Sequence, residues 1–350
     1  MVKTLSLITA SILVLAVLLA IWITRDGELI TPKGAGTVTL DAGQFEAYPL
    51  PEYVTEVLTE DYKSYLVEVE SGIKIHVLEV GTGYPVYLQH GNPTSGLLYR
   101  KVAAKLPTER LRAIMPTMVG LGFSSKIPVS DHKLENHVRW MNSLLEQLDL
   151  TELIYVGQDW GGPVGMGALA ISPDLLKGAV LMNTAFIAPT ENADLSTAHA
   201  VVKSPVIGEL IMEVFTTLFD QLRGVQGDPN SMNESVKSLY ARPVLESGNA
   251  KAPVALMRMV ADGPDHPSTP AMRVIEAYVD TLDIPAEIVW GKRDPILGLA
   301  LPAMEKDFPN APVTETDAGH FLQEEVPEVI AAAIVRVVDK LETATPKASE

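Results

Sequence analysis

The sequence predicts an α/β fold in which a mostly parallel sheet is covered by helices and interrupted by a helical cap. From residue 61 onward, short apolar runs alternate with helical patterns, as is typical of parallel strands joined by helices. Between residues 184 and 280 the pattern is mainly helical, with several Pro and Gly breaks. Strand patterns then resume, so we expect one sheet domain that carries an insertion.

The sheet is expected to open with an antiparallel pair, 65–69 and 74–80. Apolar runs predict the later strands, which in chain order are 85–89, 112–116, 153–158, 179–183, 286–290 and 313–316. Leu, Val and Met recur at helical spacing over 134–148, opposite a polar face, which indicates an amphipathic helix. A closing helix is expected over 327–341.

Composition excludes several classes of function. The 350 residues are 47% hydrophobic and suffice for a large core, while the net charge of -17 argues against a nucleic-acid partner. The chain has no cysteine, so it has no disulfide framework, thiolate metal site or thiol nucleophile. We expect neither a cofactor nor a bound metal ion.

Residues 5–23 form an uncharged run rich in Leu, Ile, Val and Ala, long enough for a transmembrane anchor. A cleaved secretion signal is the alternative, but its apolar region is normally shorter and ends in small residues, unlike 21–25 here. Lys3 precedes the run, and Arg25 is offset by two acidic residues soon after it. These charges favour a catalytic domain outside the cytoplasm, with a lipid bilayer as a partner.

These patterns divide the chain into six parts. They are the anchor (1–25), a linker (26–60), the first part of the sheet domain (61–183), the cap (184–280), the second part of the sheet domain (281–342) and a tail (343–350).

The most informative motif is Gly157-Gln158-Asp159-Trp160-Gly161-Gly162, which follows the strand 153–158 and precedes a helical pattern. This context is what a nucleophile elbow requires, although a helix-capping aspartate is the simpler alternative. Asp159 stands where hydrolases usually carry serine. A serine attacking a saturated carbon would leave an unreactive ether, whereas a carboxylate leaves an ester that water can cleave.

Two further candidates follow later strands. Asp294 comes after the strand 286–290, and His320 comes after the last strand. The order nucleophile, acid, histidine is that of an α/β-hydrolase, and the carboxyl ends of parallel strands bring such groups together. Asp294 also fits a simple turn residue beside Pro295.

Three motifs resemble those of the haloalkane dehalogenases of the α/β-hydrolase superfamily. They are the elbow motif, His90-Gly91-Asn92-Pro93-Thr94-Ser95 and Gly319-His320-Phe321-Leu322-Gln323-Glu324-Glu325. A further family motif resembles Tyr240-Ala241-Arg242-Pro243 in the expected cap. The resemblance covers roughly residues 55–342. It implies hydrolysis of a halogenated aliphatic molecule with water to an alcohol, a halide ion and a proton, through an alkyl ester on Asp159.

The resemblance also implies a role for each matching residue. Asp159 would be the nucleophile, His320 the base and Asp294 the acid that orients it. Asn92 and the Trp160 indole would bind the halide, and the backbone N–H groups of the same two residues would stabilise the oxyanion. Candidate pocket-lining residues, each of which also fits ordinary core, are Phe186, Phe215, Phe219, Phe321 and Leu322.

Two segments lack residues that other members of the family use, and this indicates a subgroup of the haloalkane dehalogenases. Residues 184–282 contain no tryptophan for a second halide donor, and 183–186 offers no glutamate as an alternative acid. An Asp-His-Asp triad with an Asn-Trp halide pair resembles the third subgroup of the family, in which large assemblies occur. A homo-oligomer is therefore one expectation.

Two other functions stay open. An epoxide hydrolase uses the same aspartate ester but protonates an alkoxide with cap tyrosines, and Tyr240 and Tyr278 lie in the expected cap. A non-catalytic, membrane-tethered ligand-binding protein of the same fold is the second alternative. Haloacids are disfavoured as substrates, because 116–122 carries no arginine to clamp a carboxylate.

Overall fold

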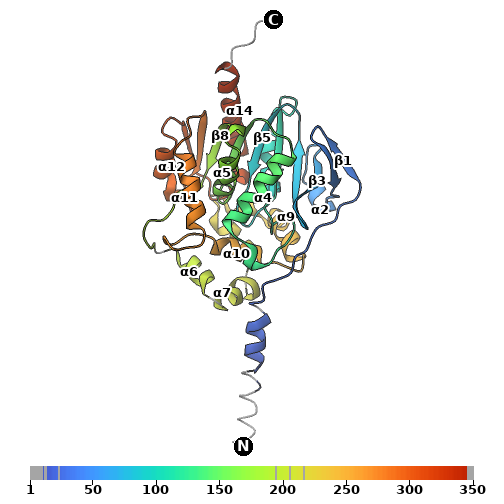
Figure 1. Cartoon of the computed structure of the whole chain (residues 1–350), viewed down its shortest axis with the longest axis vertical. Coiled ribbons are helices and arrows are strands. Elements are labelled where there is room, and N and C mark those ends of the chain that lie inside the picture. Colours follow the sequence, from blue (N-terminus) through green and yellow to red (C-terminus); the bar gives the residue numbers. More distant parts are fainter. Residues whose placement is uncertain are drawn as a thin grey trace, which may run out of the picture.

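The structure is a computed structural model that describes residues 11, 14–22, 24–193, 195–204, 206–215 and 217–344. One sheet runs through the centre of the molecule, with helices packed on it (Figure 1). The expected α/β architecture, a mostly parallel sheet flanked by helices, is confirmed.

The sheet contains ten strands in the order β1-β2-β3-β4-β6-β5-β7-β8-β9-β10. The strands are β1 (Thr37–Leu40), β2 (Gly43–Ala47), β3 (Lys63–Glu70), β4 (Ile73–Val80), β5 (Tyr84–Gln89), β6 (Leu111–Pro116), β7 (Leu153–Gln158), β8 (Leu176–Met182), β9 (Ala286–Gly291) and β10 (Val313–Thr316). Pairing is antiparallel from β1 to β4 and between β4 and β6, and it is parallel from β6 to β10. The site strands β5, β7, β8, β9 and β10 therefore end at one edge.

Helices connect and cover these strands. They are α2 (Glu52–Thr55), α3 (Arg100–Ala103), α4 (Leu134–Gln147), α5 (Gly161–Ile171), α6 (Thr197–Lys203), α7 (Ile207–Glu209), α8 (Leu218–Gln221), α9 (Glu234–Leu245), α10 (Ala252–Arg258), α11 (Thr269–Val279), α12 (Leu301–Asp307), α13 (Leu322–Glu325) and α14 (Pro327–Ala344). Helices α4, α5 and α11 form one contiguous layer, and α14 packs on β8, β9 and α3.

Burial explains why these segments form strands and helices. All six residues of β7 are buried, as expected for a central parallel strand whose two faces are covered by helices. In α4, the apolar residues at helical spacing are buried, including Leu134, Met141 and Leu145. The burial of these apolar faces against the sheet is the main source of the fold's stability.

The segment 26–60 differs from the expected linker. It contains β1, β2 and α2, and β2 pairs with β3, which extends the sheet. Phe45 packs against Tyr65 with ring centroids 5.4 Å apart. These strands are only four and five residues long, too short for their periodicity to distinguish them from a Gly-rich linker.

The cap boundary also differs. Helices α6 to α10 lie within the expected insertion, but α11, expected in the cap, packs on α5 in the layer that covers the sheet. Met272, Ile275 and Val279 of α11 are buried. A helix that buries an apolar stripe looks the same in sequence whether it packs on a sheet layer or within a cap.

The expected anchor, 5–23, lies partly outside the described residues. Residues 14–22 form a helix that projects from the end of the molecule where α6 and α7 lie (Figure 1). Among the residues that the structure describes, no helix combines the length and the hydropathy needed to cross a membrane. Of the expected tail, 345–350 lies outside the described residues.

Candidate active site

Asp159 occupies a sharp turn between β7 and α5. Its φ of 50° lies in the left-handed region, which is costly for a non-glycine residue. The Asp159 N–H donates to the Asn183 carbonyl at 3.0 Å, and Thr184 Oγ1 donates to the Asp159 carbonyl at 2.8 Å. A Cβ at Gly161 would lie 2.2 Å from the Gln89 carbonyl oxygen, so the following helix can start here only with glycine. This strand, turn and helix have the geometry of an elbow.

The three residues expected to form a triad lie together beyond the carboxyl ends of β7, β9 and β10. His320 Nδ1 lies 2.8 Å from Asp294 Oδ2, and His320 Nε2 lies 3.6 Å from Asp159 Oδ2. Asp294 and His320 are buried, whereas 17% of the Asp159 side chain is exposed. With Nδ1–H donated to Asp294, Nε2 of the neutral imidazole is an acceptor on the side of Asp159, and the Gln158 amide Nε2 lies 3.2 Å from it.

The surroundings shift the pKa values of the two carboxyl groups in opposite directions. Burial lowers the pKa of His320, but the Asp294 and Asp159 carboxylates raise it more, and the net shift is upward. Burial raises the pKa of Asp159, although His320 and two backbone N–H groups oppose this. For Asp294 the effect of burial is outweighed by His320, so its pKa is lowered. Asp294 therefore stays ionised and holds the imidazole in place.

Replacing Asp294 with asparagine is expected to lower kcat by roughly 10⁴-fold, because an amide can stabilise the wrong imidazole tautomer. In the unmodified protein the rate should fall as the pH drops through the raised pKa of His320, since only neutral imidazole accepts a proton. The midpoint of the pH profile of the variant's residual activity should lie at lower pH, because the Asp294 carboxylate that raises the pKa of His320 is gone. Halide release measured between about pH 5 and pH 9 checks both effects, and an unchanged inflection would contradict the assigned pairing.

Asn183 is a site residue that the sequence did not reveal. It follows β8, and its Nδ2 donates to Asp294 Oδ2 at 2.8 Å and to the Gly291 carbonyl at 3.0 Å. Its Oδ1 accepts from the Gly291 N–H at 2.8 Å, and the Ile296 N–H donates to Asp294 Oδ1 at 2.7 Å. Asn183 therefore positions Asp294. The sequence signal that could have indicated Asn183 is its place directly after a strand. Asparagine tolerates positive φ better than most residues, and the φ of Asn183 is 25°.

Backbone donors face the Asp159 carboxylate. The Asn92 N–H donates to Asp159 Oδ1 at 2.8 Å, and the Trp160 N–H also hydrogen-bonds the carboxylate. A Cβ at Gly91 would lie 2.2 Å from Asp159 Oδ1, so only glycine lets the loop approach this closely. The expected oxyanion donors are thus adjacent to the Asp159 carboxylate.

The two expected halide donors differ in their present contacts. Trp160 is nearly buried, and its indole N–H makes no hydrogen bond with any described residue. The Asn92 side chain donates through Nδ2 to the carbonyl of Pro253, in the cap helix α10, at 2.9 Å. A carboxamide has two N–H bonds, so Asn92 keeps one donor for another acceptor.

His90 holds the loop that carries Gly91 and Asn92. Its Nε2 accepts from the Met118 N–H at 2.9 Å, and its Nδ1 lies 2.7 Å from the Gly91 carbonyl. Burial lowers the pKa of His90 to about 4, so it is neutral in this role. In the described part of the chain, no group of three or more His, Asp or Glu side chains could hold a metal ion.

The expected pocket-lining residues are buried wherever their side chains are described. Phe186 packs against Phe308, with ring centroids 6.4 Å apart, and Phe321 packs edge-on against His320 at 4.7 Å. Phe219 and Leu322 belong to the same core cluster, while the side chain of Phe215 lies outside the described residues. Phe321 therefore contacts a residue of the expected triad.

The cap tyrosines do not form a donor pair for an epoxide oxygen. The Tyr240 hydroxyl donates to Glu324 Oε1 and accepts from Arg100 Nη1 at 3.2 Å. Tyr278 lies on α11, which packs on α5, and its buried hydroxyl has no hydrogen-bond partner among the described residues. The Tyr240 proton is thus committed to a buried network, which weakens the epoxide hydrolase alternative.

Comparisons with known proteins agree with this architecture. The family model described as the alpha/beta hydrolase fold matches residues 84–327. The haloalkane dehalogenase 2 of Mycobacterium tuberculosis is 29% identical over 265 residues, which cover 75% of this chain and 90% of that protein. The cis-3-alkyl-4-alkyloxetan-2-one decarboxylase of Shewanella oneidensis is 27% identical over 282 residues, or 78% of this chain and 87% of that protein.

A solved structure shows the same fold. The tetrameric haloalkane dehalogenase of Paraglaciecola agarilytica superposes with a TM-score of 0.71 at 23% identity, covering 83% of this chain and 98% of that one. The family model spans most of the chain, from β5 to the start of α14, and includes all the expected site residues. The chain belongs to the family described as the alpha/beta hydrolase fold.

Proposed function

We propose that the protein hydrolyses haloalkanes to an alcohol, a halide ion and a proton through an alkyl ester on Asp159. The observation that carries this proposal is the surroundings of the Asp159 carboxylate. It has His320 Nε2 at 3.6 Å and a backbone N–H at 2.8 Å, and the next residue offers an indole N–H without a partner among the described residues. An attacking carboxylate, a base and a donor for an anion thus share one site.

In the first step, one oxygen of Asp159 attacks the carbon that carries the halogen. The carbon–oxygen bond forms as the carbon–halogen bond breaks, and the halide leaves with the bonding electron pair. Halide is a very weak base, so it needs hydrogen-bond donors rather than a proton. The Trp160 indole and the second N–H of Asn92 would supply them. Burial of the Asp159 carboxylate reduces its solvation and favours attack.

In the second step, His320 Nε2 takes a proton from water, and the resulting hydroxide attacks the carbonyl carbon of the ester. The oxyanion forms where the Asn92 and Trp160 N–H groups already bind Asp159. Collapse of this intermediate breaks the bond between the carbonyl carbon and the alkyl oxygen, and the alkyl oxygen takes the proton of the newly added hydroxyl group. This releases the alcohol and restores the Asp159 carboxylate. Asp294 stabilises the imidazolium until its proton passes to solvent.

Purified protein is expected to release halide from 1-bromobutane and 1,2-dibromoethane with multiple turnovers, and to leave styrene oxide unopened. Halide ion and alcohol are quantified together, because hydrolysis yields them in equal amounts. Opening of styrene oxide without any halide release from either bromide would replace this proposal with the epoxide hydrolase alternative.

A second candidate function is the opening of a cis-3,4-dialkyl oxetan-2-one with loss of carbon dioxide. It is favoured by the 27% identity to the decarboxylase of Shewanella oneidensis. The Asp159 carboxylate would attack the ring carbon that bears the ring oxygen and break that carbon–oxygen bond. Loss of carbon dioxide from the freed carboxylate would then expel Asp159 and leave an alkene. Release of carbon dioxide from such a lactone, with no halide released from the bromoalkanes, would favour this second function.

We infer that the protein belongs to the third subgroup of haloalkane dehalogenases and forms homo-oligomers. The 2.8 Å contact between His320 and Asp294 supports an aspartate as the acid, and a structural neighbour is described as tetrameric. Light scattering of the purified protein tests the assembly. A monomer at all concentrations would contradict it.

We propose that residues 5–23 anchor the protein in a membrane and that its catalytic domain lies outside the cytoplasm. The described part of this run supports the proposal, because its apolar side chains are exposed, including Leu15 (66%) and Ile21 (62%). Resistance to carbonate extraction and digestion by added proteinase in intact spheroplasts are expected. Full protection from the proteinase would contradict the orientation.

A further inference from the structure

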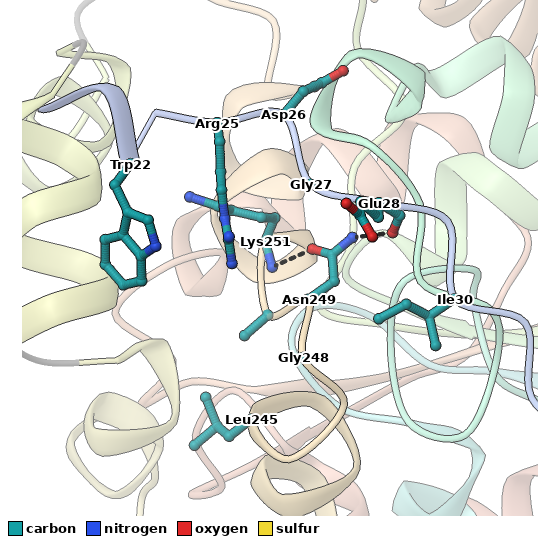
Figure 2. A pocket seen from close by; sticks show the side chains of 11 residues that line it. Trp22, Arg25, Asp26, Gly27, Glu28, Ile30, Leu245, Gly248, Asn249 and Lys251 are labelled. Atoms are coloured by element: carbon teal, nitrogen blue, oxygen red, sulfur yellow. Dashed lines mark hydrogen bonds between the residues drawn. The ribbon is translucent and has the colours of Figure 1, made fainter. Parts of the chain in front are cut away.

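A cavity lies between the end of the N-terminal helix and the loop that joins α9 to α10. Its volume is about 540 Å³, and its walls include Trp22, Arg25, Glu28, Asn249 and Lys251 (Figure 2). None of the triad residues lines it. The cavity is therefore a separate site, built where the N-terminal segment meets the cap.

Two basic residues, Arg25 and Lys251, line this cavity together with the acidic residues Asp26 and Glu28. The Arg25 guanidinium lies 5.3 Å from the centre of the Trp22 ring and makes no ion pair with any described residue. The Lys251 side chain lines the same space (Figure 2). The nearby Asp26 carboxylate points away, because it accepts hydrogen bonds from the Ser130 N–H at 2.8 Å and Oγ at 2.7 Å.

The walls of the cavity are held by buried hydrogen bonds. Asn249 is buried, and its Nδ2 donates to the Glu28 carbonyl at 2.8 Å and to the Ile127 carbonyl at 3.0 Å. The Val129 N–H donates to the Asp26 carbonyl at 2.7 Å. The N-terminal segment is thus fixed to the cap and to the sheet domain, so the space beside Arg25 is a preformed part of the fold.

Apolar surface surrounds this end of the molecule. The helix 14–22 exposes its apolar side chains, and nearby Leu245 is 46% exposed on the cavity rim. In the cap, Ile207 of α7 is 55% exposed, and α7 lies at the end from which the N-terminal helix projects (Figure 1). Apolar side chains below a tryptophan and basic groups are the arrangement that proteins present to the surface of a bilayer.

We propose that this cavity binds the headgroup phosphate of an anionic phospholipid. The inference rests on the proposed membrane anchor and is independent of the proposed dehalogenation. Arg25 would pair with the phosphate, and Trp22 would lie at the level of the headgroups. Helix α10 begins directly after Lys251, and the Pro253 carbonyl accepts the Asn92 amide, so the bound lipid would hold the active-site side of the cap at the membrane surface.

The test uses the full chain in nanodiscs of equal parts phosphatidylcholine and phosphatidylglycerol, followed by native mass spectrometry that counts retained lipids. The protein should retain phosphatidylglycerol in preference to phosphatidylcholine. Arg25→Gln should reduce that retention at least about fivefold, the loss expected when one charge-assisted hydrogen bond is removed. The control Arg273→Gln removes the same charge from the exposed face of α11 and should retain lipid as the unmodified protein does.

Three results would overturn the headgroup site. The first is equal retention of phosphatidylglycerol with and without Arg25, and the second is equal retention of the two lipids. The third is complete displacement of the lipid by millimolar inorganic phosphate, which would show that the site binds a soluble anion instead. Extraction of the protein by carbonate would contradict the anchor and this site together. Halide release is assayed separately, so failure of the lipid site leaves the proposed reaction untouched.

Discussion

Replacing His320 with glutamine is expected to limit the protein to one halide ion per molecule. The Asp159 carboxylate would still attack the haloalkane, because this step needs the nucleophile and the halide donors but no base. The resulting ester would persist, since glutamine cannot take a proton from water, and steady-state turnover should fall by at least about 10⁴-fold. Rapid-quench halide measurement and peptide mass spectrometry after 1-bromobutane should show one equivalent of halide and a butyl group on Asp159.

The matched control is Asp159→Asn, which should release no halide and carry no alkyl group. Both variants keep a polar side chain of similar size at a buried or half-buried site, so thermal unfolding should confirm that each is folded. Continued turnover by the His320 variant would contradict the role of this residue as the base.

Replacing Glu324 with glutamine is expected to lower the free energy of unfolding by about 3–5 kcal/mol, because it leaves a buried cation without its partner. Arg100 Nη1 lies 2.5 Å from Glu324 Oε1, with side chains 6% and 0% exposed. Lys101 Nζ lies 2.9 Å from Oε2, and the Tyr240 hydroxyl also donates to this carboxylate. The network joins the cap helix α9 to α3 and α13 of the sheet domain. Urea unfolding followed by circular dichroism measures the change.

The control for this prediction is Glu328→Gln, which removes the same charge from the first turn of α14. Glu328 pairs with Lys105 at 3.1 Å, but its side chain is 65% exposed, so the loss should be at most about 1 kcal/mol. If both variants lost a similar free energy of unfolding, burial would not be the reason for the strength of the Glu324 network.

The strands that border the site could be predicted because each is an apolar run with a distinct end. The expected bounds of 153–158 and 313–316 are those of β7 and β10, since these runs are terminated by sharp turns. That Asp159, Asp294 and His320 lie near one another could be predicted, because Asp159 directly follows β7 and the other two stand a few residues beyond β9 and β10. A local sequence pattern therefore predicts the place of a residue when that place is set by the end of the strand just before it.

Features that depend on distant contacts could not be predicted. The strand β2 forms because it pairs with β3, and β1 forms because it pairs with β2, while nothing in their own short sequences requires either pairing. Asn183 supports Asp294 across 111 residues of sequence, and Tyr240 joins Glu324 across 84. From the sequence, Tyr240 is a candidate hydrogen-bond donor to a substrate. In the structure its hydroxyl donates to the buried carboxylate of Glu324, which is distant in sequence.

A single-turnover reaction in ¹⁸O-enriched water tests the covalent Asp159 ester most directly. With protein in excess over 1-bromobutane, the oxygen of the first butanol comes from the Asp159 carboxylate, because water attacks the carbonyl carbon rather than the alkyl carbon. We therefore predict unlabelled butanol in the first turnover and ¹⁸O in the Asp159 peptide. Labelled butanol in that turnover, with no label in the peptide, would show that water displaces the halide directly and would contradict the mechanism.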